Sequence, residues 1–146
     1  MKPQKQRVVD KGMGDCFAAC MASLLELPIE VMPNDHSEYW WFIWEKFLDQ
    51  FGLELTSCSA NGPIWSEYPW IASVKSKNYD NTTHAIIAHN GGEVLFDPST
   101  KKTYKMGESL LGDKDVVRGG YIIRVSDFSK LHKLHEYRLK LESSTK

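Results

Sequence analysis

The stretch Gly14-Asp15-Cys16-Phe17-Ala18-Ala19-Cys20-Met21-Ala22-Ser23-Leu24-Leu25, near the start of the chain, decides how the rest is interpreted. Gly14 permits a sharp backbone turn, Asp15 is a favourable N-cap, and the ten residues that follow are small or apolar. The stretch therefore predicts a helix over about residues 15–27, with Cys16 on its first turn. A thiol there feels the positive end of the helix dipole and the free backbone N–H groups, and both favour the nucleophilic thiolate.

The composition of the 146-residue chain predicts a single α+β domain over residues 1–146. The chain is 42% hydrophobic with a net charge of −1, so neither nucleic acid nor an anionic membrane is an expected partner. No apolar run approaches the roughly 20 residues that span a bilayer, and the first ten residues lack a signal-peptide core. An odd number of cysteines, three, fits a reducing cytosol better than a disulfide framework, which predicts a cytoplasmic protein.

Hydrophobic periodicity predicts the elements that follow. A second helix over residues 37–51 carries an aromatic stripe of Trp40, Trp44, Phe47 and Phe51, and we expect this stripe to be core rather than a ligand-stacking surface. Alternating or continuous apolar runs predict strands at residues 53–58, 70–74, 84–89, 93–97 and 120–125. Asp127 begins a predicted C-terminal helix that runs to about residue 141.

The strands at residues 84–89 and 93–97 predict a hairpin, because Asn90-Gly91-Gly92 between them is a strong turn signal. His84 opens the first strand and Asp97 ends the second, at nearly equal distances from the turn. The two ends of an antiparallel hairpin lie side by side, so the carboxylate is expected to orient the imidazole. Cys16 would complete a triad of nucleophile, base and orienting residue.

The GDCFAAC opening that continues to Pro28, together with the hairpin of His84-Ala85 and Asp97-Pro98, resembles the papain-like cysteine peptidase superfamily in its compact bacterial and phage-borne branches. The resemblance implies a papain-like fold, with an N-terminal helix that bears the nucleophile packed on an antiparallel sheet. It also implies that Cys16 is the nucleophile, His84 the general base and acid, and Asp97 the orienting residue. Gln6 is the nearest match to the glutamine that often stabilises the oxyanion in this superfamily.

These residues also have simpler interpretations: His84 could be a satisfied strand-end histidine, and Asp97 before Pro98 could be only a turn former. Free cysteines are usually small buried hydrophobes, which is our expectation for Cys20 and Cys58. Cys16, Cys20 and His84 could form a zinc site, but the CxxC spacing typical of structural zinc is absent, so no metal or cofactor is expected.

The polar loop over residues 59–69 contains two large aromatic residues, Trp65 and Tyr68. Few loops this polar need such side chains for folding alone, so we expect them to border the groove beside Cys16 and contact substrate. The alternative is that both pack onto the helix of residues 37–51.

These observations predict a cysteine hydrolase that cleaves a peptide, isopeptide or other amide bond through a thioester. A transglutaminase-like acyl transferase is an alternative, because the two activities differ only in whether water or an amine reaches the thioester. A catalytically inactive papain-like module that binds a partner protein is another. The expected partner is a peptide or protein, met in the host cytoplasm if the chain is phage-encoded. Substrate identity and oligomeric state leave no readable trace in the sequence.

Overall fold

The structure is a computed structural model that describes residues 1–7, 14–34, 36–58, 67–111 and 117–144. The chain forms two units, Met1–Asn34 with Ser57–Ile122 and Asp35–Thr56 with Ile123–Lys146. The expected single domain over residues 1–146 stays a prediction. No helix among the described residues has the length and apolar character needed to cross a membrane.

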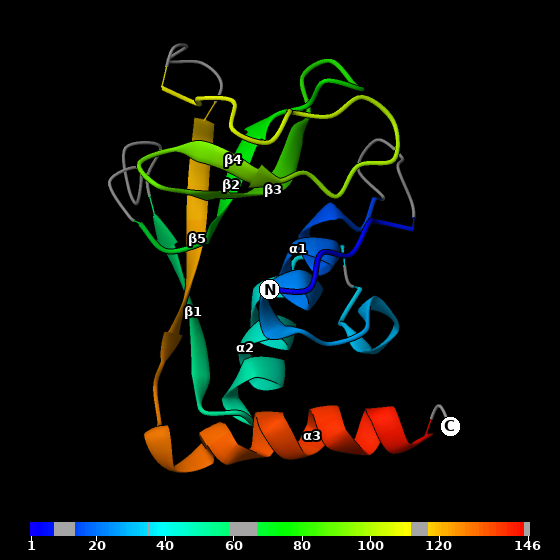
Figure 1. The fold of residues 1–146 in the computed structure, drawn as a ribbon, viewed down its shortest axis with the longest axis vertical. Coiled ribbons are helices and arrows are strands. Elements are labelled where there is room, and N and C mark those ends of the chain that lie inside the picture. The colour runs from blue at the N-terminus through cyan, green and yellow to red at the C-terminus, as the bar shows by residue number, and fades with distance from the viewer. Residues whose placement is uncertain (8–13, 35, 59–66, 112–116, 145–146) are drawn as a thin grey trace. The chain divides into compact units, whose positions relative to one another are not determined.

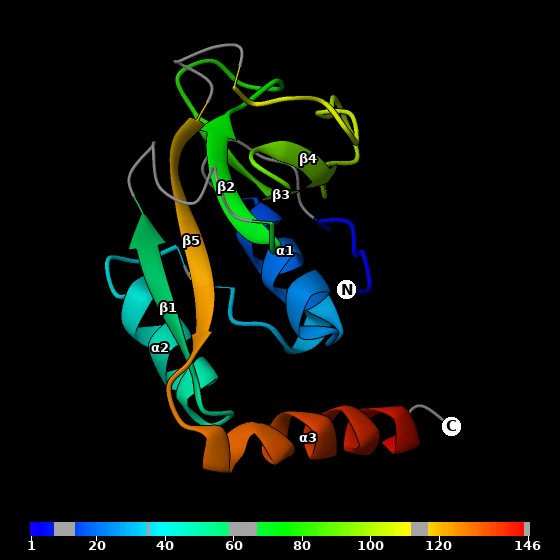
Figure 2. The same ribbon diagram turned by 60° about the vertical axis from the view of Figure 1, so that its left-hand side comes forward.

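The first unit combines a helix with antiparallel strands (Figure 1). Its elements are α1 (Cys16–Leu25), the 3-10 helix η1 (Ile29–Val31), β2 (Trp70–Lys75), β3 (Thr83–His89), β4 (Glu93–Phe96) and the first part of β5 (Val117–Val125). Neighbouring strands follow the order β5-β2-β3-β4 (Figure 2), and α1 packs against β3. All three strand pairs are antiparallel, which confirms the mixed α+β class.

A buried cluster fixes the strands of the first unit. Apolar side chains from β2, β3, β4 and β5 meet two residues of the segment after β4, namely Trp70, Ala72, Val74, Ile86, Ala88, Val94, Tyr104, Leu110 and Val117. Burial of the larger aliphatic side chains, such as Ile86 and Val94, contributes about 1.5–3 kcal/mol each. The cluster therefore holds β3 and β4, the two strands of the predicted hairpin, in one register.

The β3–β4 hairpin forms at the predicted turn. Asn90, Gly91 and Gly92 all have positive φ, at 45°, 75° and 103°. Ala88 pairs with Val94 beyond the turn, and the register then shifts before Ile87 pairs with Phe96. This irregularity inserts an extra residue in β4, which the sequence count from the turn did not anticipate.

Helix α1 begins at Cys16 with Asp15 at the N-cap position, and it ends earlier than predicted. Asp15 precedes the helix without a side-chain cap hydrogen bond, so its expected capping role is wrong. At the other end Glu26 adopts a left-handed conformation, φ 55°, and the Leu27 N–H donates to the Ala22 carbonyl over 3.0 Å. The helix therefore ends at Leu25 rather than at Leu27, because a left-handed residue cannot continue it.

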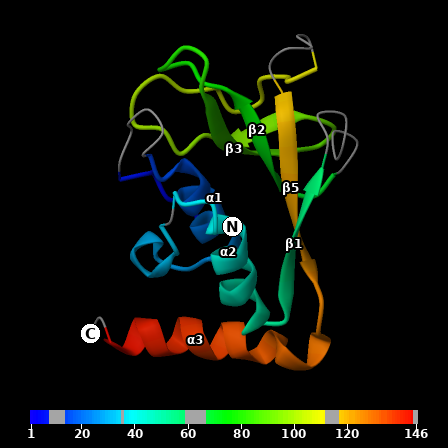
Figure 3. The same ribbon diagram turned by 180° about the vertical axis from the view of Figure 1, so that it is seen from behind.

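The second unit contains α2 (Trp40–Asp49), most of β1 (Leu53–Cys58), the end of β5, the 3-10 helix η3 (Phe128–Lys130) and α3 (Leu131–Ser144), as Figure 3 shows. Trp44 and Phe51 are buried and Trp40 and Phe47 are half-buried, so the aromatic stripe is core along part of its length. Phe51 also packs on Tyr137 of α3, with ring centroids 5.6 Å apart.

Candidate active site

Cys16 is the first residue of α1 and its thiol is half-buried. The backbone N–H of Ala85, in β3, donates to the Cys16 Sγ over 3.5 Å. The sulfur is thus partly exposed at the N-terminus of a helix and accepts one backbone N–H. The packing of α1 against β3 therefore brings the predicted nucleophile beside the strand that carries His84.

His84 and Asp97 form the predicted pair. The Nε2 of His84 donates to the Oδ1 of Asp97 over 2.7 Å, and the two side chains are 10% and 2% exposed. Continuing the pairing of Ile87 with Phe96 places Asp97 opposite Ile86, two residues from His84 on the same face of β3. The contact is therefore diagonal across the hairpin rather than directly opposite.

The carboxylate of Asp97 is fixed by further hydrogen bonds. Its Oδ1 also accepts the Ser99 N–H over 2.9 Å, and its Oδ2 accepts the Tyr104 N–H over 2.8 Å. Burial opposes the charged carboxylate, but the hydrogen bond and the positive charge of His84, followed by the two backbone donors, lower the pKa of Asp97. Asp97 is thus an ionised acceptor that orients His84.

His84 is positively charged at neutral pH. Burial by itself would lower the pKa of His84, but hydrogen bonds with Asp97 and with the Cys16 thiol, together with their charges, raise it to about 9. The hydrogen bond with Asp97 uses Nε2, so proton exchange with Cys16 would use Nδ1, the other ring nitrogen. The structure thus joins Cys16, His84 and Asp97, the three residues that the sequence predicted for the triad.

Gln6 lies between the two halves of this site. Its side chain is buried, and its backbone N–H donates to the Pro98 carbonyl over 2.9 Å, directly after Asp97. The next residue, Arg7, donates its backbone N–H to the Asp15 carboxylate over 2.9 Å, directly before Cys16. Gln6 is ten positions from Cys16 in sequence. In the fold, Gln6 itself bonds to the residue after Asp97, and its neighbour Arg7 bonds to the residue before Cys16.

The two predicted substrate-contacting residues have different outcomes. Tyr68 is 79% exposed, so it is not a core residue, and its packing on the helix of residues 37–51 stays an untested alternative. Its contact with substrate stays a prediction. Trp65 lies outside the described residues.

The other two cysteines differ from each other. Cys20 is fully buried as expected, and burial, with smaller contributions from the charges of Cys16 and Asp97, raises the pKa of its thiol. Cys58 is half-buried, so the expectation that it is a core hydrophobe is wrong. It is the last residue of β1, and the final three residues of this strand are all more exposed than Leu53 and Leu55.

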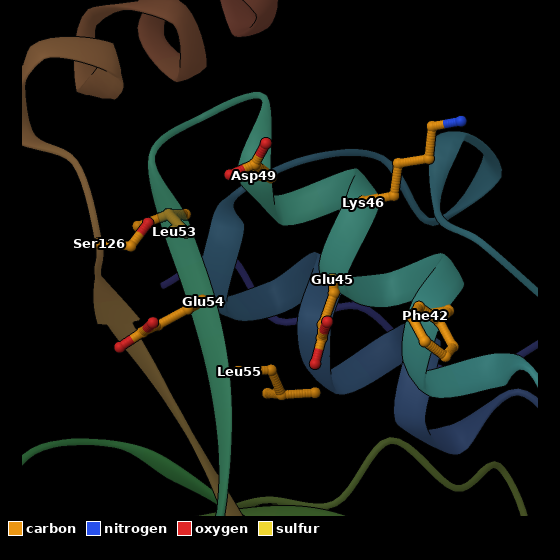
Figure 4. A pocket seen from close by; sticks show the side chains of 8 residues that line it. All are labelled: Phe42, Glu45, Lys46, Asp49, Leu53, Glu54, Leu55 and Ser126. Atoms are coloured by element: carbon orange, nitrogen blue, oxygen red, sulfur yellow. The ribbon is translucent and has the colours of Figure 1, made fainter.

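In the part of the chain that the structure describes, no group of three or more His, Cys, Asp or Glu side chains is arranged to hold a metal ion. In the second unit, a cavity of about 460 Å³ lies beside α2 and β1 (Figure 4). Three carboxylates line it, those of Glu45, Asp49 and Glu54. Two of them already have partners, because the Trp41 indole N–H donates to Glu45 and Lys130 pairs with Asp49 at 3.9 Å. This cavity contains none of the residues predicted for the active site.

Several residues that support the site were not predicted from the sequence. The bond from the Ser99 N–H back to Asp97 is an Asx turn, which the Asp-Pro-Ser sequence could have indicated. Ala85 and Tyr104 contribute backbone N–H groups, which almost every residue carries, so their identities gave no signal. Arg7 is joined to Asp15 by a contact across eight residues, which no local pattern encodes.

Comparisons with protein-family models, curated protein sequences and solved structures gave no match.

Proposed function

We propose that this protein is a cysteine hydrolase of papain-like type that cleaves an amide bond of a peptide or protein. The observation that carries the proposal is the hydrogen bond of His84 with Asp97, next to the Cys16 sulfur that accepts the N–H of Ala85, the residue after His84. Nucleophile, base and orienting carboxylate within hydrogen-bond reach of one another are the recurring arrangement of thiol acyl transfer.

The first half-reaction begins from the ion pair of Cys16 thiolate and His84 imidazolium. The sulfur attacks the substrate carbonyl carbon, a C–S bond forms, and the carbonyl π electrons move to the oxygen. As this oxyanion collapses, the C–N bond breaks and Nδ1 of His84 gives its proton to the departing nitrogen. The product is an acyl thioester on Cys16 and a neutral imidazole.

The second half-reaction uses the same groups in reverse. Neutral His84 takes a proton from water, the hydroxide attacks the thioester carbonyl, and the C–S bond breaks to release the acid and restore the ion pair. Asp97 keeps the imidazole oriented and stabilises its positive charge in both steps. The N–H groups at the start of α1, which the Asp15 side chain does not cap, and the Gln6 carboxamide are the proposed oxyanion donors.

Acylation by p-nitrophenyl acetate tests this proposal. The thiolate attacks the ester carbonyl and p-nitrophenolate leaves, so an acetyl thioester accumulates on one residue. We expect intact mass and peptide mapping to place the acetyl group on Cys16. His84→Ala should abolish this labelling, whereas His89→Ala, at the other end of β3, should keep it. Labelling that is independent of His84, or that favours Cys58, would refute the proposal.

A further inference from the structure

Residues Met1–Arg7 form what we call the N-terminal strap. Its first half is held near the C-terminal end of α1. The Gln4 N–H donates to the Ser23 Oγ over 2.8 Å, and the Ile29 N–H donates to the Gln4 Oε1 over 2.8 Å. The N-terminal ammonium group also pairs with Glu26 at 3.4 Å. The strap therefore has a fixed direction along the helix.

The second half of the strap is held by both sides of the candidate site. Lys5 Nζ donates to the carbonyl groups of Asp97 and Ser99, over 2.9 Å and 3.1 Å. The Gln6 N–H donates to the Pro98 carbonyl over 2.9 Å. Arg7 donates to Asp15 twice, from its backbone N–H to Oδ1 over 2.9 Å and from Nε to Oδ2 over 3.1 Å. Gln6 is therefore held by its own backbone and by both of its neighbours.

The Asp15 carboxylate, which anchors Arg7, is buried at the N-terminus of α1. Its side chain is 0% exposed, and a buried carboxylate is costly unless charged or hydrogen-bonded groups compensate it. It does not cap α1, although it occupies the N-cap position. Two of its hydrogen bonds go instead to Arg7, the residue that follows Gln6.

We propose that Asp15 and Arg7 are positioning residues that hold Gln6 as an oxyanion donor beside Cys16. This inference rests on the proposed function and deepens it. Asp15 adjoins the nucleophile and Arg7 adjoins Gln6, so their contact sets the distance between the sulfur and the Gln6 carboxamide. An oxyanion donor acts only when it is fixed where charge develops, and loss of one such donor typically lowers the rate by about 10²–10³.

Two reagents separate this role from a general effect on the thiol. Acylation by p-nitrophenyl acetate passes through an oxyanion, so it needs the donor. Alkylation by iodoacetamide displaces iodide from a saturated carbon and forms no oxyanion, so it reports only the thiolate and its access. The ratio of the two second-order rates at Cys16 is therefore the readout. A structural role for Asp15 would lower both rates together and leave the ratio unchanged.

We expect Asp15→Asn to lower this ratio by about tenfold or more, with alkylation nearly unchanged. Gln6→Ala should lower it as well, and the double variant should lose no more than Gln6→Ala alone, because both changes act through the same carboxamide. Glu26→Gln, which breaks the strap contact at the other end of α1, is the matched control and should keep the wild-type ratio.

Arg7→Met provides a second test, because Arg7 is exposed and its replacement leaves the backbone bond to Asp15 in place. We expect a several-fold lower ratio even if Asp15→Asn does not fold. Wild-type ratios in the Arg7 and Asp15 variants, or additive losses in the double variant, would overturn this inference while the proposed function stands. A wild-type protein that p-nitrophenyl acetate does not acylate at Cys16 would overturn both.

Discussion

At the scale of single residues, the site depends on one buried pair of opposite charges, His84 and Asp97. Such a pair is stable only when further hydrogen bonds satisfy both groups. Ser99 and Tyr104 donate them to Asp97, and the interaction with Cys16 favours the charged form of His84. The pair is thus coupled to the backbone after β4 on one side and to Cys16, the proposed nucleophile, on the other.

Asp97→Asn should destabilise the protein as well as slow its chemistry. Whichever way the new amide turns, its NH₂ group faces the N–H of Tyr104 or the donors from Ser99 and His84. An unsatisfied buried polar group of this kind costs about 1–3 kcal/mol. Urea denaturation at pH 7 measures this loss, and the exposed Asp80→Asn is the control, with a change of no more than about 0.5 kcal/mol. A wild-type midpoint for Asp97→Asn would contradict the described hydrogen bonds.

The pH dependence of stability should carry the signature of His84. A pKa raised from 6.5 to about 9 means that the folded state binds the proton more tightly than the unfolded state. The contribution is complete below pH 6.5 and lost as the pH rises to about 9, and it amounts to about 3 kcal/mol at most. The pKa of Asp97 is lowered, so its contribution is present above 3.8 and is lost as the pH falls below that value.

Urea midpoints of the wild type and of His84→Asn between pH 6 and pH 9.5 measure this contribution. The difference in unfolding free energy between the two proteins should shrink steadily across this range. A difference that is constant with pH would show that His84 is not held as the cation.

At the scale of elements, turns that contain glycine set the course of the backbone between one helix or strand and the next. The β3–β4 turn needs three consecutive residues of positive φ, and Asn-Gly-Gly provides them at low cost. In the second unit, Gly52 has φ 70° and its carbonyl accepts the N–H groups of Ser126 and Asp127, over 2.8 Å and 3.1 Å. Gly52 therefore joins the end of α2 to the start of η3.

Gly52→Ala should lower the stability of the second unit by more than the cost of placing alanine at a positive φ. A Cβ at Gly52 would lie 2.1 Å from the Asp127 carbonyl oxygen, so the backbone must shift. Gly107, at φ 86°, is a matched control because a Cβ there meets nothing within 4 Å. Gly107→Ala should cost about 1–2 kcal/mol from its left-handed conformation, and Gly52→Ala clearly more. Equal losses in thermal denaturation would show that the contact with Asp127 is not tight.

At the scale of the whole molecule, local signals predicted the elements and long-range contacts set the details of the site. The Cys16 helix, the hairpin turn and the encounter of His84 with Asp97 followed from periodicity, turn chemistry and strand pairing. The extra residue in β4 was not predictable, because the register follows from packing in the buried cluster rather than from the turn. The strap was not predictable either, since its hydrogen bonds reach residues in or near α1 and after β4, and most of them join a side chain to a backbone group.

The rate of iodoacetamide alkylation at each cysteine, measured against pH by peptide mass spectrometry, tests the central claim most directly. The claim is that His84 and Asp97 make Cys16 a nucleophile, while burial keeps Cys20 protonated. We expect Cys16 to react fastest at pH 6–7, Cys58 more slowly and Cys20 slowest, with the advantage of Cys16 lost in His84→Ala. Equal rates at the three cysteines, or a Cys16 rate unchanged by His84→Ala, would contradict the account.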